Sequence, residues 1–532
     1  MTEPTSTSHG APEGEPGLDG DLGTRVVEST DPGRGARRRQ VAWVLFVLFV
    51  STYAYFQSST QWNENSRFDL TRSLIERGRL DIDPYHINTE DKARFSGHYY
   101  SDKAPGASLL GTLGYGLFYG VRRLLGKALP RQWIRHPAGW RSPRTGRRMP
   151  FPAMGYNPAY RRGLAFANLT ANVIPAALAL ALLFFVLVTR FHRSDQQALF
   201  AVFVYGLGSL AFPYATLFYG HQLAASLLIT AWSLWELGRD ERATRPAWHG
   251  ILAGLLLAYA VATEYTVAPV AAFLGLWMLW GTPRRVRTFL RMTGGALPVA
   301  VALAFYHWAC FGSPFSVGYQ HLVDPVFAKG MSQGLLGLRS PDPRVAAALL
   351  LGPHRGLFFE SPVFVLSLVG LWAWWRQGPR GFVALVAATF VYYWMLNASY
   401  YMWDGGAALG PRHMIPALGL LAAAVAWAYP EGPGKIARAA RLTCFGSLAW
   451  SVANMLAATA VGPEAPMGTA DPLTDFVWPH FLDGSLAYTQ GSSNFGQLLG
   501  LPGLWSLLPL GLVWSLVALW FWRLVKNGRA SA

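Results

Sequence analysis

Charged residues are scarce in this chain. Only 14% of its 532 residues are Asp, Glu, Lys or Arg, while 52% are hydrophobic. A water-soluble chain carries about a quarter charged residues, so the shortage of charge excludes an ordinary soluble protein and favours a chain that folds in lipid. Tryptophan is plentiful instead, with 22 residues, as expected where aromatic rings gather at the membrane–water interfaces.

Cysteine is almost absent, and so are the short motifs of nucleotide and metal chemistry. Cys310 and Cys444 both lie in or beside apolar runs, so no disulfide framework or metal-ligand set is expected. There is no P-loop, no dinucleotide-binding fingerprint and no HExxH sequence. We assign no metal and no certain cofactor, and leave a divalent cation open. The net charge of +16 comes from arginines that flank apolar runs, so no nucleic-acid partner is expected.

Long apolar runs are what the sequence has instead. A helix needs about 20 apolar residues to cross the hydrocarbon of a membrane. The sequence therefore predicts an all-α, polytopic membrane protein with about 12 transmembrane helices over residues 41–532. Residues 1–40 are rich in Gly, Pro, Ser, Thr and acid, which predicts a disordered cytoplasmic tail. The candidate helices begin at Val41, Gly163, Ala198, His221, Ile251, Thr266, Met292, Pro362, Phe382, Ile415, Leu442 and Leu501.

Arginines predict which side of the membrane each loop faces. The short loops after residues 189, 237, 281, 375, 430 and 522 are basic and form, with the N-terminal side, one cytoplasmic set under the positive-inside rule. The long polar segments 58–162, 311–361, 399–414 and 462–500 then face outward. This orientation requires the short apolar run 105–121 to lie at the outer interface rather than to cross. The basic stretch 122–162 is the one misfit, and its role stays open.

The first outer segment concentrates the charge. Residues 62–77 predict an amphipathic helix that carries Glu64 and Arg67 along one side. Most charges here are typical of a solvated helix with ion pairs along its surface. Glu64 differs, because it follows the first membrane exit by only a few residues. Its carboxylate is therefore expected at the membrane–water boundary, where a reaction on a lipid head group takes place.

A spaced motif follows in the same segment. A membrane exit is followed by an acid-x-x-Arg-aromatic helix and then by G-x-Y-Y-x-x-K-x-P. This pattern resembles the first periplasmic loop of the GT-C glycosyltransferases, above all bacterial relatives of the protein O-mannosyltransferases and of the aminoarabinose transferases that modify lipid A. That family usually shows two adjacent acids where this chain has Glu64-Asn65. The matching residues are Glu64, Arg67, Phe68, Gly97, Tyr99, Tyr100, Lys103 and Pro105.

The resemblance implies a GT-C-like fold and a hexosyl- or pentosyltransferase. Its donor would be a sugar on a polyprenyl phosphate, and its acceptor a lipid, a protein or a glycan at the periplasmic face of a bacterial inner membrane. A carboxylate would accept the proton of the acceptor hydroxyl, and cations would neutralise the leaving phosphate. We expect Glu64, or in reserve Asp69, as the base, and Lys103, Arg355 and Arg412 on the phosphate. Further candidate site residues are Arg67, His98, Tyr100, Asp102, His221, Glu264, Trp403 and His413.

Two other functions stay open. A lipid or solute transporter, or a flippase, would move its substrate unchanged and would depend on charges at mid-membrane, where Glu264 interrupts an apolar run. A polysaccharide polymerase or ligase would use a diphosphate-linked oligosaccharide. The sequence shows neither an internal repeat nor the paired broken helices of many transporters. The long polar segments on a single side favour an enzyme.

Overall fold

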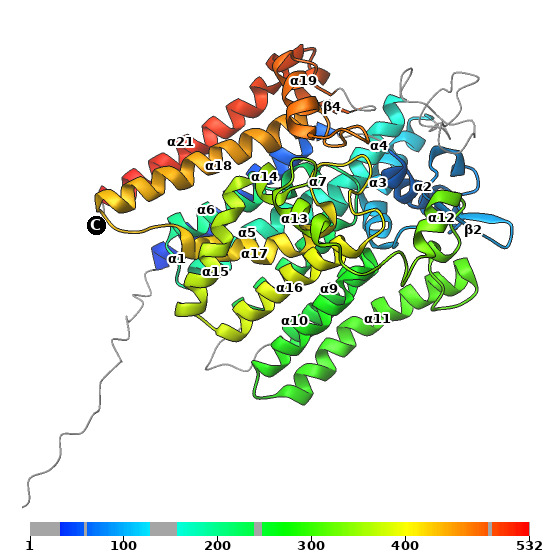
Figure 1. Cartoon of the computed structure of the whole chain (residues 1–532), viewed down its shortest axis with the longest axis horizontal. Coiled ribbons are helices and arrows are strands. Elements are labelled where there is room, and N and C mark those ends of the chain that lie inside the picture. Colours follow the sequence, from blue (N-terminus) through cyan, green and yellow to red (C-terminus); the bar gives the residue numbers. More distant parts are fainter. Residues whose placement is uncertain (1–31, 58–60, 128–156, 239–246, 488–491, 531–532) are drawn as a thin grey trace, which may run out of the picture.

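The computed structural model describes residues 32–57, 61–127, 157–238, 247–487 and 492–530 (Figure 1). Helices dominate these ranges, which confirms the expected all-α class. Every apolar run named above overlaps a helix. The long helices are α1 (Pro32–Ala54), α5 (Ile174–Thr189), α6 (Asp195–Gly206), α8 (His221–Leu237), α9 (Ala247–Thr263), α10 (Ala268–Trp280), α11 (Arg285–Phe311), α15 (Leu366–Gln377), α16 (Arg380–Ser399), α17 (Ile415–Ala428), α18 (Lys435–Val461) and α21 (Leu508–Ala530).

Shorter elements fill the connections. Two small antiparallel sheets pair β1 (Phe56–Gln57) with β4 (Ser493–Asn494) and β2 (Lys92–Phe95) with β3 (His98–Ser101). The helices in these connections are α2 (Trp62–Arg77), α3 (Gly106–Leu124), α4 (Pro158–Asn168), α7 (Ala211–Ala215), α12 (Pro325–Met331), α13 (Pro343–Leu351), α14 (Leu357–Glu360), α19 (Trp478–Leu482) and α20 (Phe495–Leu498).

Membrane-spanning character follows from helix length and composition. In the described ranges, five helical stretches are long and apolar enough to cross a membrane, and three shorter apolar helices accompany them. The chain is a multi-pass membrane protein, while the number of twelve spans stays a prediction. The five stretches are Pro158–Thr189, Arg285–Phe311, Arg380–Ser399, Lys435–Val461 and Gly503–Leu524; the shorter helices are Trp248–Thr263, Tyr265–Trp280 and Arg412–Ala428.

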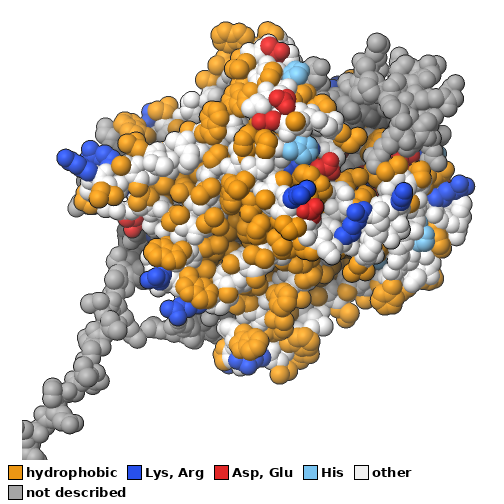
Figure 2. All heavy atoms as spheres, in the orientation of Figure 1, with side chains coloured by type: hydrophobic (Ala, Val, Ile, Leu, Met, Phe, Trp, Pro, Cys, Tyr) orange, Lys and Arg blue, Asp and Glu red, His pale blue; other side chains and the backbone are white. Residues whose placement is uncertain are grey.

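The core lies where small residues let helices approach. Residues 415–427 of α17 are all buried, and α17 packs against α6, α8 and α15. Its alanines and Gly419 leave little side chain between the helix axes, which is how helices pack closely inside membranes. The surface differs: in Figure 2, apolar side chains cover much of the visible face, and Lys and Arg side chains are few and scattered on it.

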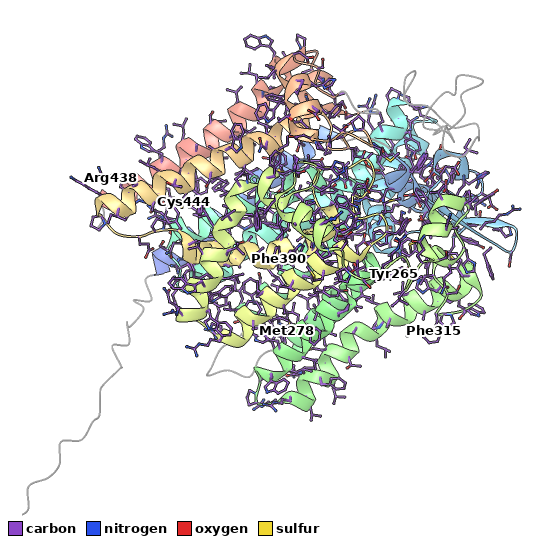
Figure 3. All side chains as sticks on the ribbon, viewed as in Figure 1. Tyr265, Met278, Phe315, Phe390, Arg438 and Cys444 are labelled. Carbon is purple, nitrogen blue, oxygen red and sulfur yellow. The ribbon has the colours of Figure 1, made fainter. Side chains whose placement is uncertain are left out.

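The two ends of the helix bundle differ in structure. One end carries α2, the β2–β3 hairpin and α12 (right in Figure 1); we call it the α2 end. The C-terminus and the first turns of α1 and α18 lie at the opposite end. In Figure 3, Arg438 of α18 and Phe315, which follows α11, mark these opposite ends. The predicted basic loop before α18 and the predicted outer segment 311–361 are therefore on different sides of the bundle.

At the α2 end the predicted helices form, but α2 is not the amphipathic helix with solvated charges that was expected, because its residues 64–73 are all buried. The helix predicted over 62–77 is α2, and it ends at Gly78, whose φ of 65° lets its N–H bond back to Leu74 and Ser73. The run 105–121 forms α3, which packs on α2 and α4. The apolar run at 251–281 is broken at Glu264, whose extended backbone separates α9 from the turn before α10.

Two predictions concern residues that are only partly described. Of the tail 1–40, residues 1–31 lie outside the described ranges, and residues 32–40 already belong to α1 rather than to a disordered segment. Of the basic stretch 122–162, residues 128–156 lie outside the described ranges.

Candidate active site

Glu264 contacts two other predicted site residues, Arg67 and His221. Arg67 of α2 donates from Nη2 to Glu264 Oε1 at 3.0 Å, and His221 Nδ1, at the start of α8, lies 3.4 Å from the same oxygen. All three side chains are buried. The approach requires glycine at position 220, because a Cβ there would stand 2.3 Å from Glu264 Oε1. A buried carboxylate that holds an arginine fixes the direction of α2 in the site.

Lys103 lies between two carboxylates. Its Nζ is 2.9 Å from Asp91 Oδ2 and 3.0 Å from Asp102 Oδ2. Burial alone would lower the pKa of Lys103, but Asp102 and Asp91 outweigh burial and hold its pKa above the ordinary value. An ammonium group has three donors, so two bonds to carboxylates leave a third for an anion. Lys103 is thus a cation that is charged, held in place and able to bind one more oxygen.

Arg412 enters the site from a loop that Glu360 holds. Gly410, with a φ of 60°, donates its N–H to Glu360 Oε1 at 2.9 Å, and a Cβ at Gly410 would stand 2.4 Å from Glu360 Oε2. Arg412 follows, and its Nη1 donates to Tyr219 Oη at 3.2 Å. The buried Nε of Arg412 has no hydrogen-bond partner among the described residues. This arginine therefore retains a donor for a ligand.

These groups form one cluster at the α2 end. Glu264 interacts electrostatically with Arg67, Lys103 and Arg412. His221 interacts with Lys103 and with His413, whose ring lies 5.3 Å from the His221 ring and from that of Tyr400. Tyr265, the residue after Glu264, is labelled in Figure 3 on the side of the bundle away from Arg438. The cluster draws on α2, the loop after β3, the start of α8, the α9–α10 break and the loop before α17.

Glu64 faces a carboxyl group that the sequence analysis missed. Its carboxyl contacts that of Glu464, which follows α18, and both side chains are buried. Burial, then the charge of Glu464, raise the pKa of Glu64 well above its ordinary value. Burial likewise raises the pKa of Glu464 to about 7. The available signal was an acid directly after an apolar run, but only the fold shows that it returns to α2.

Asp69, the reserve base, lies on another face of α2. Its carboxylate accepts from Asn88 Nδ2 at 3.0 Å and from Tyr160 Oη at 3.3 Å. Burial raises the pKa of Asp69 to about 8 despite the neighbouring Arg72. Its bonds therefore join α2 to α4 and to the turn at Asn88, away from Lys103 and Arg412.

Other predicted residues also have partners away from this cluster. Arg355 donates from all three nitrogens to the carbonyl oxygens of His354, Asp404 and Gly406 at 2.7–2.8 Å. Trp403 lies against His354, with ring centroids 5.9 Å apart.

The β2–β3 hairpin carries two more of the predicted residues. His98 is exposed there and pairs with Asp83 at 2.7 Å. Tyr100 packs in an apolar cluster with Ile82 and Phe311. The structure does not place either of them in contact with the Lys103 and Arg412 cluster.

An apolar cavity of about 180 Å³ adjoins the site. It lies beside the end of α1, α4 and the π-helical turn Leu169–Val173. Phe218 lines it, and the next residue, Tyr219, bonds Arg412. Its walls are mostly apolar, with a few polar groups. The lining residues are Tyr53, Ala54, Phe56, Gln57, Arg161, Leu164, Ala165, Phe166, Asn168, Leu169, Val173, Thr216 and Phe218.

Metal-ligand geometry is not evident in the described residues. They contain no group of three or more His, Cys, Asp or Glu side chains placed to hold an ion. The Glu64–Glu464 pair offers two carboxyl groups, and Tyr219 already donates to one of them at 2.6 Å.

Comparisons with known proteins give a likeness in fold. No family model and no curated protein matches the chain. The structure of ArnT from Cupriavidus metallidurans bound to undecaprenyl phosphate matches 74% of this chain and 60% of that one, at 15% identity and a TM-score of 0.43. ArnT in the apo state matches at 14% identity and the same TM-score, over 74% and 59%. The chain thus spans about 60% of the length of ArnT.

Proposed function

We propose that this chain is a membrane glycosyltransferase that moves a sugar from a polyprenyl-phosphate carrier to an acceptor at the α2 end of the bundle. That end corresponds to the periplasmic face of a bacterial inner membrane in the orientation that the basic loops predict. One observation carries the proposal: a buried carboxyl group and two cations with remaining donors, Lys103 and Arg412, gather at one end of an apolar helix bundle. A carrier with a charged head and an apolar tail matches this combination.

The reaction follows from what these groups can do. The acceptor hydroxyl attacks the anomeric carbon, its proton passes to the Glu64 carboxyl group, and the carbon–oxygen bond to the phosphate breaks. The departing phosphate gains a negative charge as it leaves, which Lys103 and Arg412 stabilise. A single displacement of this kind inverts the configuration at the anomeric carbon. Arg67, held by Glu264, positions α2 and with it the base.

The cavity beside Phe218 accommodates the first isoprene units of the carrier. Its apolar lining adjoins the segment that positions Tyr219 and Arg412. A phosphate bound by Arg412 therefore lies close to apolar space, because Phe218 of the cavity directly precedes Tyr219, which bonds Arg412. Undecaprenyl phosphate, which the ArnT structure contains, is the carrier that we would use in binding tests.

The test uses the purified, full-length protein in lipid nanodiscs with a panel of sugars on undecaprenyl phosphate and a membrane extract as acceptor source. Release of undecaprenyl phosphate is measured by mass spectrometry. We expect Glu64→Gln to lower the rate about 100-fold or more because the general base is lost. Lys103→Ala should lower it about as far because the leaving phosphate loses a cation.

The matched control is Glu236→Gln, a buried glutamate that pairs with Arg190 at the other end of α8; its rate should stay near that of the wild type. Unchanged rates in both site variants would overturn the proposal. Carriers that cross the bilayer with their mass unchanged would indicate a transporter, and release of a diphosphate would indicate a polymerase or ligase.

A further inference from the structure

Glu464 is a buried acid that has no role in the proposed reaction. It lies three residues beyond the end of α18, where Gly462, with a φ of 130°, turns the chain back toward α2. The Glu464 side chain is 2% exposed. Burying a carboxyl group costs free energy unless the group is paired or protonated. The partners of Glu464 must therefore offset this cost.

Its partners connect it to both halves of the site. Tyr219 Oη donates to Glu464 Oε1 at 2.6 Å, and the same hydroxyl accepts from Arg412 Nη1 at 3.2 Å. On the other side, Glu464 contacts the carboxyl group of Glu64 and the side chain of Gln61. An unbroken series of contacts therefore runs from the phosphate-binding cation, through Tyr219 and Glu464, to the base.

The contact between Glu64 and Glu464 requires a proton. Two ionised carboxylates in contact repel each other, so the pair is favourable when one proton is shared. No other side chain among the described residues donates to either oxygen of Glu64, whereas Tyr219 donates to Glu464. Asn65, which stands where the resembled motif has a second acid, cannot take this part: its side chain bonds the Asn88 carbonyl and Tyr160.

We propose that Glu464 and Glu64 share one proton and work as a single base, with Glu464 the positioning residue that acts through Glu64. This inference rests on the proposed glycosyl transfer and supplies the second acid from a distant part of the chain. Before reaction the pair holds one proton and one negative charge. As the acceptor oxygen bonds the anomeric carbon, its proton neutralises the pair, and the bond to the phosphate breaks with its electrons on the phosphate.

Several charged and titratable groups face the pair, and they fix how it responds to pH. Arg412 and Arg67 stabilise its ionised form, Tyr219 donates to it, and Tyr214 of α7 lies behind Tyr219. Protonation of the ionised pair removes the base, so activity falls as pH decreases. Because the pKa of Glu464, raised by burial, is about 7, we expect the acid limb of the rate profile near neutral pH.

Two substitutions shift this limb to higher pH. The limb reports the first ionisation of the pair, in which the protonated partner donates the shared proton to the carboxylate that forms. Glu464→Gln leaves Glu64 to ionise alone, with its pKa raised by burial, so the limb moves to higher pH by roughly one pH unit. The plateau rate falls about tenfold because the base is no longer held in position. Tyr219→Phe removes a donor to ionised Glu464, so the limb again moves to higher pH. Residues with a structural role alone would change the rate without shifting the limb.

The experiment is the pH dependence of undecaprenyl phosphate release by the full-length protein in nanodiscs, for the wild type, Glu464→Gln, Tyr219→Phe and the control Glu236→Gln. Upward shifts in both variants with an unshifted control support the shared proton. If Glu464→Gln does not fold, the upward shift of Tyr219→Phe remains the test. A limb that stays in place in the folded variants overturns the inference, whereas a wild type without transferase activity overturns the proposed function itself.

Discussion

Single arginines in this protein differ in what their guanidinium groups can still bind. Arg355 donates from its three nitrogens to backbone carbonyls, which makes it part of the loop that carries Asp404 and Gly406. Arg412 donates to Tyr219, and its Nε has no partner among the described residues. Both were predicted as phosphate ligands from sequence, where the two look alike. Of the two, only Arg412 has a guanidinium nitrogen without a bond to the described residues.

Because of this difference, we expect Arg412 to contribute mainly to carrier binding and Arg355 mainly to the stability of the fold. Arg412→Ala should weaken undecaprenyl phosphate binding about tenfold or more, because a charge-assisted hydrogen bond is lost, while the melting temperature stays near that of the wild type. Arg355→Ala should instead cost about 3 kcal/mol of stability, since buried carbonyls lose their donors. Thermal unfolding and carrier titration of both variants in the same detergent check this. The reverse assignment of the two effects would contradict it.

Helix geometry alone could have predicted that Asp69 and Glu64 lie on different faces of α2. At 3.6 residues per turn, Asp69 lies about 140° around α2 from Glu64, whereas Arg67 lies about 60° away. The two predicted bases therefore could not share one site. What geometry along one helix does not give is the partner of Glu64, because Glu464 reaches it from the far end of the chain.

At the scale of elements, the helices were predictable because the information is local. An apolar run of sufficient length has to satisfy its backbone within itself in lipid, and a buried acid such as Glu264 marks a break. The course of 105–121 as α3 was foreseen for the same reason. Its packing on α2 and α4 was not, because it depends on Gly114, where a Cβ would stand 1.9 Å from the Phe166 carbonyl oxygen.

The loops that build the site were the least predictable elements. The contact between Gly410 and Glu360 holds the loop that positions Arg412. The sequence around either residue does not predict that the other is its partner. Lys103 was expected as a phosphate ligand from the resembled motif, but its two carboxylate partners are set by the folding of the hairpin and of the turn at Asp91. A long-range pair such as Gly410 and Glu360 forms only once the helices are packed.

At the scale of the whole molecule, the proposal depends on which side of the membrane the α2 end faces. Phe315 is 89% exposed, and Arg438 is exposed at the opposite end of the bundle (Figure 3). Cys310 and Cys444 are buried and unpaired, so the background of thiol labelling should be low. We expect a membrane-impermeant maleimide to label Phe315→Cys in intact bacterial cells, and Arg438→Cys only after permeabilisation. The opposite pattern would place the site in the cytoplasm and remove the periplasmic assignment.

The most direct measurement is an experimental structure of the full-length protein in nanodiscs with undecaprenyl phosphate. We predict the phosphate between the Lys103 ammonium and the Arg412 guanidinium, with the Glu64 carboxyl group facing the position of the sugar and the first isoprene units beside Phe218. A phosphate bound elsewhere, with Lys103 still enclosed by Asp91 and Asp102 and Arg412 not in contact with it, would contradict the account.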